Sequence, residues 1–303
     1  MKRFITLFSQ QVCDGADLTM CKNKSEVRDM SSSIRDMNKE IITKEDWYED
    51  IMGQLKEVEK FVSNMGWLTF GRDYFLCGEK CFSLQNIIVS LELTAGSIAS
   101  CVENAVFADA AILIRKYRDD LFFYLYISLY DRQQKQGLPS AEKMARNISK
   151  WLNNGLKNFD FKKDVLKTIE EDATFSELFQ EYDINGSLRH IGRQLNDFVH
   201  ANKYNCYNRN INAYSTDELK IHAEDVVSNM LYLTICFVVL LILVSPLSVM
   251  ASDYIDALDC NMVPPENSEY WVAPFVEKFL SKNVKLIDDN CYGYLKNQTN
   301  MQL

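Results

Sequence analysis

Apolar residues recur every three or four positions along most of the chain, which is the spacing that places them on one face of an α-helix. This pattern predicts two amphipathic helices between residues 25 and 64. The second is expected to begin at Thr43, because Asp46 follows three residues later as a capping partner. Two long helices are predicted at 83–105 and 107–134, and the turn sequence GLPS ends the second.

Shorter helices are expected next, at 141–154, 162–172, 174–179 and 187–203. Thr174 and Glu177 predict a capping box at the third of these, and Ser215 and Glu218 predict another at the start of a later apolar helix. No stretch alternates apolar and polar residues clearly enough to indicate a β-strand. The chain is therefore expected to be all-α, a helical bundle.

The most apolar stretch, MLYLTICFVVLLILVSPLS at 230–248, is long and apolar enough for a membrane span. Its flanks carry acids at both ends, whereas membrane spans are usually bordered by Lys or Arg. A central helix buried on all sides in a bundle or dimer would have the same composition. Both interpretations remain open, with inner-membrane tethering as the alternative to a cytoplasmic protein.

We expect three parts along the chain, without internal repeats: an N-terminal helical extension at 1–65, a helical bundle at 66–250 and a C-terminal tail at 251–303. The tail holds one amphipathic helix, with aromatic residues four apart at Trp271, Phe275 and Phe279. If the apolar helix is buried, the tail docks back on the bundle. If that helix spans a membrane, the tail lies on its far side.

Composition limits the class of protein. A net charge of −9 argues against a protein that coats nucleic acid through a wholly basic surface. A local exception lies at 186–210, where one acid, Asp197, accompanies four bases: Arg189, Arg193, Lys203 and Arg209. The nine scattered cysteines and the short apolar run at the start indicate a reduced, cytosolic compartment without a signal peptide.

The candidate site is the stretch GRQLNDFVHANKYN at 192–205. On a helix its apolar residues fall within one arc: Leu188, Ile191, Leu195, Phe198 and Val199. Arg193 and His200 share the opposite, polar face, because seven residues turn the helix almost two full turns. Asn196 lies between them.

This pair suits RNA cleavage. Histidine exchanges a proton near neutral pH, so His200 can act on a ribose 2′-hydroxyl, and a guanidinium such as Arg193 binds the neighbouring phosphate. Asn196 is expected to orient the histidine or contact the sugar, with Asp197 at the edge of the face. The alternative is that the pair has no catalytic role and belongs to a solvated polar helix face, which has the same sequence pattern.

Arg193, the polar Gln194 and His200 after six intervening residues resemble the signature of the HEPN superfamily. The resemblance covers the helix at 187–203 and implies a small helical bundle that dimerises. It also implies a metal-independent ribonuclease of the toxin–antitoxin or abortive-infection type, with His200 as acid/base and Arg193 as phosphate ligand. RNA, a second copy of the chain and an antitoxin or defence-system partner are the binding partners it implies.

A second candidate cluster lies in the long helix at 107–134. Arg115 and Asp119 are four apart and can form an ion pair, and Arg118 is their neighbour. These residues either reach the same cleft as Arg193, together with Arg189 and Lys203, or form an internal salt bridge.

The remaining reactive residues are expected to have no catalytic role. Cys77 and Cys81, one helical turn apart, lack the further ligands of a zinc site and are expected to be free thiols. His190 and His222 are expected at the surface or as caps. No phosphate-binding glycine loop or serine nucleophile motif occurs, so neither a metal nor another cofactor is expected.

Overall fold

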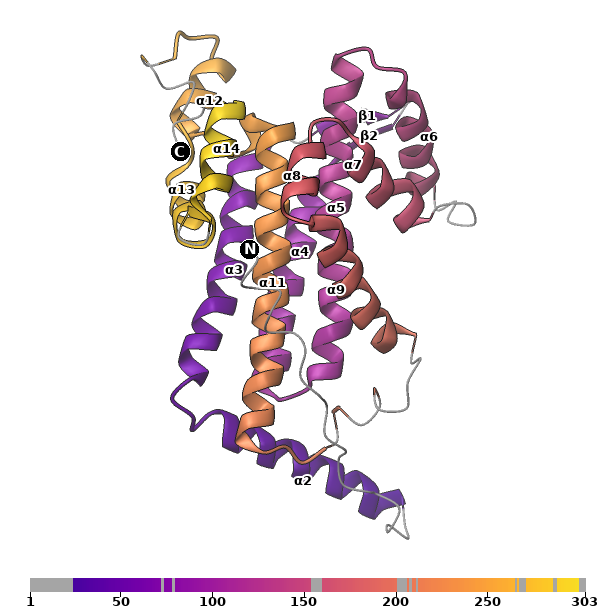
Figure 1. The fold of residues 1–303 in the computed structure, drawn as a ribbon, viewed down its shortest axis with the longest axis vertical. Coiled ribbons are helices and arrows are strands. Elements are labelled where there is room, and N and C mark those ends of the chain that lie inside the picture. Colours follow the sequence, from indigo (N-terminus) through magenta and orange to yellow (C-terminus); the bar gives the residue numbers. More distant parts are fainter. Residues whose placement is uncertain are drawn as a thin grey trace.

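The protein was analysed as a computed structural model, which describes residues 24–71, 74–77, 80–153, 160–200, 206, 209–210, 212–264, 266, 271–285 and 288–299. Within these ranges the chain is helical except for one β-hairpin, turns and connecting segments (Figure 1). The prediction of an all-α fold is confirmed.

Four long helices form a closed ring: α3 (Tyr48–Thr69), α4 (Gln85–Glu103), α5 (Phe107–Lys135) and α11 (Thr216–Val244). Each of α4 and α11 packs against both α3 and α5. Helices α5 and α11 run in the same direction, since the rings of Phe107 and His222 lie 5.2 Å apart near their starts. Near their ends, Arg132 Nη1 donates to the carbonyl oxygen of Leu243 at 2.8 Å.

The centre of the bundle is built from the two most apolar stretches. In α5 every residue from Leu121 to Tyr130 is buried, and α11 is buried continuously from Tyr232 to Val244. Because no face of these segments is polar, both must be surrounded by other helices. The buried hydroxyl groups of Tyr117 and Thr234 form a hydrogen bond with each other across this interface, at 2.9 Å.

One predicted helix start is confirmed and two are wrong. Ser215 caps α11, and the side chain of Glu218 bonds back to the Ser215 N–H, so the capping box is complete. Thr43 instead donates its hydroxyl to the Lys39 carbonyl at the end of α2 (Lys24–Ile42), and α3 begins only at Tyr48. Helix α8 (Ser176–Glu181) has no side-chain cap.

A two-stranded antiparallel hairpin, which the sequence pattern did not predict, joins α3 to α4. Its strands, β1 (Tyr74–Cys77) and β2 (Lys80–Ser83), have four residues each, too few for a clear alternation. Leu76 pairs with Cys81. Cys77 and Cys81 therefore lie on neighbouring strands rather than one helical turn apart, and both thiols are free.

A group of short helices lies along the outer side of α5 (Figure 1). They are α6 (Ser140–Leu152), the π-helix η2 (Phe161–Leu166), α7 (Lys167–Glu171), α8 and α9 (Ile184–Val199). Of these, α6, η2, α7 and α9 contact α5, and α8 connects α7 to α9. The helix that carries the candidate site is thus placed against α5, one of the long helices of the bundle.

The C-terminal tail docks on α3 and α11. After η3 (Pro246–Val249), its described part comprises α12 (Ser252–Asp259), α13 (Pro274–Leu280), η5 (Ser281–Lys285) and α14 (Asp289–Thr299), so it holds more than the one helix expected. The rings of Phe279 and Phe61 lie 4.2 Å apart, and Lys282 Nζ lies 2.5 Å from Glu57 Oε2. One cluster of buried apolar residues runs from Ile42 to Leu295, and the boundary expected at residue 65 falls within α3.

Two helices in the described part of the chain are long and apolar enough to cross a membrane. In α4 the apolar window is 39% buried, whereas in α11, which holds most of the 230–248 stretch, it is 89% buried. The apolar surface of α11 is covered by α3, α5 and α14. The length and composition of α11 would therefore allow it to cross a membrane, but within this fold α11 occupies the position of a core helix.

Candidate functional site

Helix α9 presents one apolar and one polar face, as its sequence predicts. Leu188, Ile191 and Leu195 are buried against the bundle. Phe198 is half-buried under the Arg209 guanidinium, whose Cζ lies 4.9 Å from the ring centroid. Val199 was also expected in the core but is 41% exposed, because it is the last residue of the helix.

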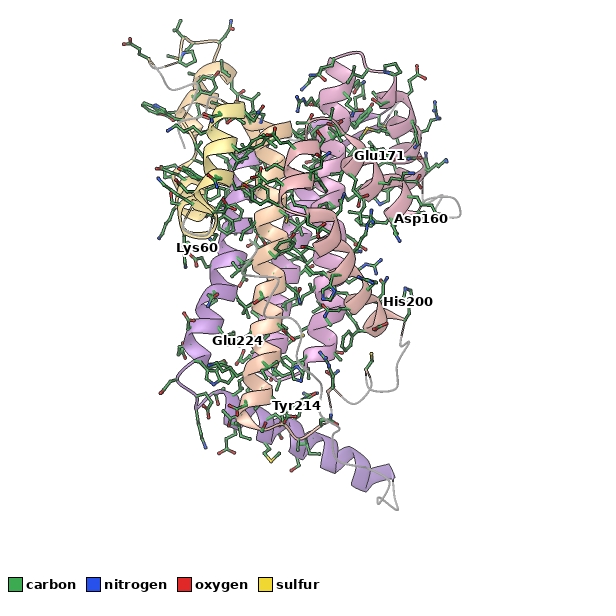
Figure 2. All side chains as sticks on the ribbon, in the orientation of Figure 1. Lys60, Asp160, Glu171, His200, Tyr214 and Glu224 are labelled. Carbon is green, nitrogen blue, oxygen red and sulfur yellow. The ribbon has the colours of Figure 1, made fainter. Side chains whose placement is uncertain are left out.

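Arg193 and His200 are both exposed on the polar side of α9. His200 follows the last helical residue, and its N–H closes the helix by donating to the Asn196 carbonyl oxygen at 3.0 Å. Figure 2 shows His200 at the outer end of the helix. Among the described residues, neither side chain has a hydrogen-bond or ion-pair partner. Both are therefore accessible to a ligand.

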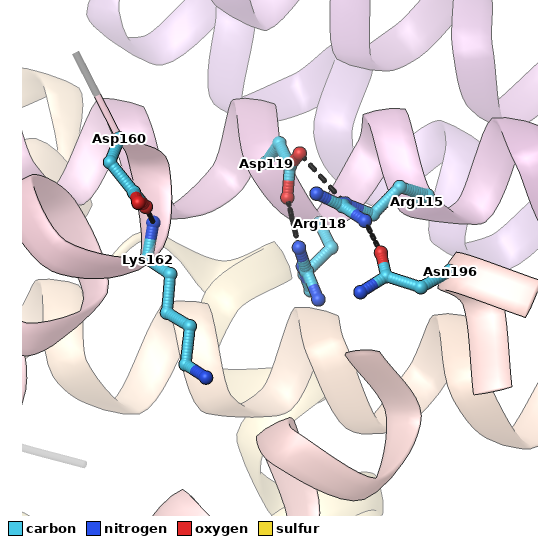
Figure 3. Close-up of polar contacts among 6 residues, drawn as sticks. All are labelled: Arg115, Arg118, Asp119, Asp160, Lys162 and Asn196. Atoms are coloured by element: carbon cyan, nitrogen blue, oxygen red, sulfur yellow. Dashed lines mark hydrogen bonds and ion pairs between the residues drawn. The ribbon is translucent and has the colours of Figure 1, made fainter. Parts of the chain in front are cut away.

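Asn196 has a different contact from the one expected. Its Oδ1 accepts a hydrogen bond from Arg115 Nη1 of α5, as Figure 3 shows, so the side chain is directed at the bundle rather than at His200. The bond connects α9 to α5 through residues 81 positions apart in sequence. Asn196 thereby fixes the rotation of the helix that carries Arg193 and His200.

Arg115 belongs to a charged cluster on one face of α5 (Figure 3). Its Nε donates to Asp119 Oδ2 at 2.9 Å, and Arg118 Nε and Nη2 donate to Oδ1 of the same carboxylate at 2.9 and 2.6 Å. Arg118 is only 4% exposed, and its Cζ lies 5.6 Å from the centroid of the Phe161 ring. Burial lowers the pKa of Arg118, Asp119 opposes this shift and Arg115 adds to it. The Arg115–Asp119 ion pair, one of the two alternatives that the sequence left open, is present, and Arg115 also contacts α9.

Gly192 completes this interface, although sequence reasoning gave it no role. A Cβ at position 192 would lie 2.5 Å from Arg118 Nη1, so any larger residue would require the guanidinium to shift. The signal was available in the sequence, since glycine inside a helix costs about 1 kcal/mol relative to alanine and needs a packing reason.

The other predicted residues of this region are dispersed. Arg189 is exposed and pairs with Glu170 of α7, with Nη2 3.3 Å from Oε2. Asp197 is half-buried, and its carbonyl oxygen accepts from the Cys206 thiol at 3.3 Å. Lys203 lies outside the described residues. The basic stretch therefore does not form one continuous ligand-binding cluster in the described part of the chain.

Of the two remaining histidines, His190 is exposed as expected, whereas His222 is half-buried within α11 and caps no helix. Its ring lies 5.2 Å from that of Phe107 and 5.0 Å from that of Tyr214. Its Nδ1 is buried without a described partner. Burial, and secondarily the charge of Arg209, lowers the pKa of His222 to about 4.

A shallow hollow of about 990 Å³ lies in the C-terminal tail, away from α9. Asp253, Trp271, Glu277 and Lys296 line it, and none of the predicted site residues does. No group of three or more His, Cys, Asp or Glu that could hold a metal ion occurs within the described ranges. Arg193 and His200 do not line this hollow.

Comparison with known proteins finds no matching family model, no similar curated protein and no similar solved structure. The resemblance to the HEPN superfamily therefore depends on the residues of α9 alone.

Proposed function

We propose that this protein is a metal-independent endoribonuclease of the HEPN type, with Arg193 and His200 as its reactive pair. The observation that supports this most is the arrangement of α9. Its polar face exposes both side chains, while Asn196 and Gly192 on the adjoining face attach the helix to Arg115 and Arg118. A catalytic pair has to be held in a fixed geometry by such supporting contacts.

The chemistry follows from the two side chains. Neutral His200 takes the proton of a ribose 2′-hydroxyl, and the 2′-oxygen attacks the adjacent phosphorus. The bond from phosphorus to the 5′-oxygen breaks, and that oxygen leaves with a proton donated by an acid. Arg193 neutralises the charge on the phosphate oxygens. The products are a 2′,3′-cyclic phosphate and a 5′-hydroxyl.

A second copy of the chain would supply that acid. Arg193 and His200 are both exposed, and exposed side chains do not exclude water from the reacting groups. If two α9 helices face each other about a two-fold axis, the protonated His200 of the second copy can serve the leaving oxygen. A homodimer is therefore part of the proposal.

The biological setting follows from the same resemblance. We propose that the protein acts as a toxin or phage-defence effector, held inactive by an antitoxin or another defence-system partner. Growth arrest on expression, relieved by loss of His200, is the expected outcome in cells. Arrest that persists in His200→Ala would instead indicate a helical protein that binds RNA or a partner without cleaving it.

We place the protein in the cytoplasm, with α11 as a core helix. The burial of its apolar window and the docking of the tail on α3 support this placement over inner-membrane tethering. Fractionation tests it: recovery in the soluble fraction without detergent is expected, and extraction only by detergent would favour the membrane-tethered alternative.

Cleavage is tested with purified protein and total RNA in the presence of EDTA. Wild type is expected to leave 2′,3′-cyclic phosphate ends, and Arg193→Ala and His200→Ala are expected to lose this activity by about 100-fold or more. His190→Ala is the matched control, because its side chain is exposed on the same helix outside the pair. Equal activity in His200→Ala and His190→Ala would refute the assignment.

A further inference from the structure

Two guanidinium groups share one carboxylate where α5 meets α9. Asp119 uses Oδ1 for Arg118 and Oδ2 for Arg115, and among the described residues it is the only acid within ion-pair distance of either. The cluster therefore keeps one net positive charge. Because Arg118 is 4% exposed, much of this charge is poorly solvated, and buried charge requires a counterion or strong hydrogen bonds.

Unused donors lie at the accessible edge of the cluster. The side chain of Arg115 is 22% exposed. Its Nε donates a hydrogen bond to Asp119, and its Nη1 donates one to Asn196. Its Nη2 and the amide nitrogen of Asn196 have no partner within the described part of the chain. Both groups only donate hydrogen bonds, so a ligand that accepts from both through oxygen atoms and carries negative charge fits them best.

We propose that the Arg115–Asn196 edge binds a phosphate group, supplied either by inorganic phosphate or by a nucleic-acid backbone. A phosphodiester carries one negative charge, which balances the excess charge of the cluster. Asn196 precedes His200 by four residues, about 6 Å along the helix axis, so a bound RNA phosphate would lie beside the reactive pair. The RNA source rests on the proposed function, whereas binding of inorganic phosphate does not.

The first test measures the unfolding temperature at constant ionic strength while phosphate replaces chloride. Phosphate stabilises most proteins non-specifically, so the comparison between variants decides. Wild type and the exposed control Arg146→Gln are expected to gain about 2–4 °C more than Arg115→Gln. Asp119→Asn leaves two unpaired guanidiniums and is expected to gain more than wild type. Equal gains in all four proteins would overturn the proposal.

Asn196→Ala provides a second variant if Arg115→Gln fails to fold, because it removes the amide donor and leaves both ion pairs intact. Its phosphate-dependent gain is expected to fall below that of wild type. Line broadening of the phosphorus resonance of inorganic phosphate by wild type, but not by Arg115→Gln, is the direct readout. Absence of this difference would contradict the proposal.

The two sources are separated with a short fluorescent RNA and the His200→Ala protein. Weaker RNA binding on adding Arg115→Gln assigns the site to the RNA backbone. An Arg115-dependent phosphate effect without any change in RNA binding assigns it to a small phosphate ligand. RNA cleavage by wild type without an Arg115-dependent effect on phosphate or RNA binding would refute this site and leave the proposed function standing.

Discussion

The guanidinium of Arg118, in α5, lies in the space that a side chain at Gly192, in α9, would occupy. A Cβ at position 192 would approach Arg118 Nη1 to 2.5 Å, closer than non-bonded atoms tolerate. Arg118 cannot easily move away, because two of its nitrogens bond Asp119 and the side chain is buried. The contact sets both the distance and the rotation of α9 relative to α5.

Gly192→Ala is therefore expected to destabilise the protein by about 1–3 kcal/mol. Alanine is intrinsically the better helix former by about 1 kcal/mol, so a loss of stability would show that the clash outweighs propensity. Gly53→Ala in α3 is the matched control, since nothing lies within 4 Å of its Cβ position. Urea unfolding of the two variants measures the difference, and a stabilised Gly192→Ala would contradict the observed packing.

The long helices were predictable because their apolar stretches are long. The sequence pattern predicted 107–134 and the structure has α5 at Phe107–Lys135. The hairpin was missed because four-residue strands show too little periodicity. The polar face of α9 was also predictable from helical geometry, since Arg193 and His200 are both exposed.

What these polar residues contact was not predictable. Asn196 bonds Arg115, 81 residues away, and no local rule selects that partner over His200. The environment of His222 has the same origin, because Phe107 and Tyr214 come from other parts of the chain. The capping box predicted at Thr174 failed for a related reason: Thr174 matches the pattern, but its N–H donates to Asp172 instead.

This difference between two similar sequence motifs is measurable. Ser215→Ala removes a real cap from α11 and is expected to cost about 1 kcal/mol. Thr174→Ala is expected to change stability by less than about 0.5 kcal/mol, because α8 has no side-chain cap. Chemical denaturation of both variants compares them directly, and equal losses would show that the Thr174 motif also caps its helix.

The docking of the tail on α3 predicts a large effect at Phe279, which is 4% exposed and packs against the ring of Phe61. Phe279→Ala is expected to cost about 3–5 kcal/mol and to increase proteolysis of the tail. Phe70→Ala is the control, because Phe70 is 66% exposed and its loss is expected to cost less than about 0.5 kcal/mol. If the tail lay across a membrane from α3, the two substitutions would have similar effects.

His222 predicts a specific dependence of stability on pH. The pKa of His222 is about 4 in the folded protein, against an ordinary value of 6.5. Between these two pKa values the unfolded chain binds a proton at His222 and the folded protein does not. The contribution of His222 to the free energy of unfolding is therefore complete above pH 6.5 and is lost as the pH falls toward 4. The loss amounts to about 3 kcal/mol at most. Burial between Phe107 and Tyr214 is the main cause, and Arg209 adds to it while Glu218 opposes it.

His222→Phe removes the titrating group and keeps an aromatic ring beside Phe107 and Tyr214. Free energies of unfolding measured between pH 6.5 and 4 are expected to fall less steeply for this variant than for wild type. His190→Gln is the matched control, and its curve is expected to run parallel to that of wild type because His190 is exposed. Parallel curves for wild type and His222→Phe would mean that the imidazole reaches solvent and takes up its proton without unfolding the protein.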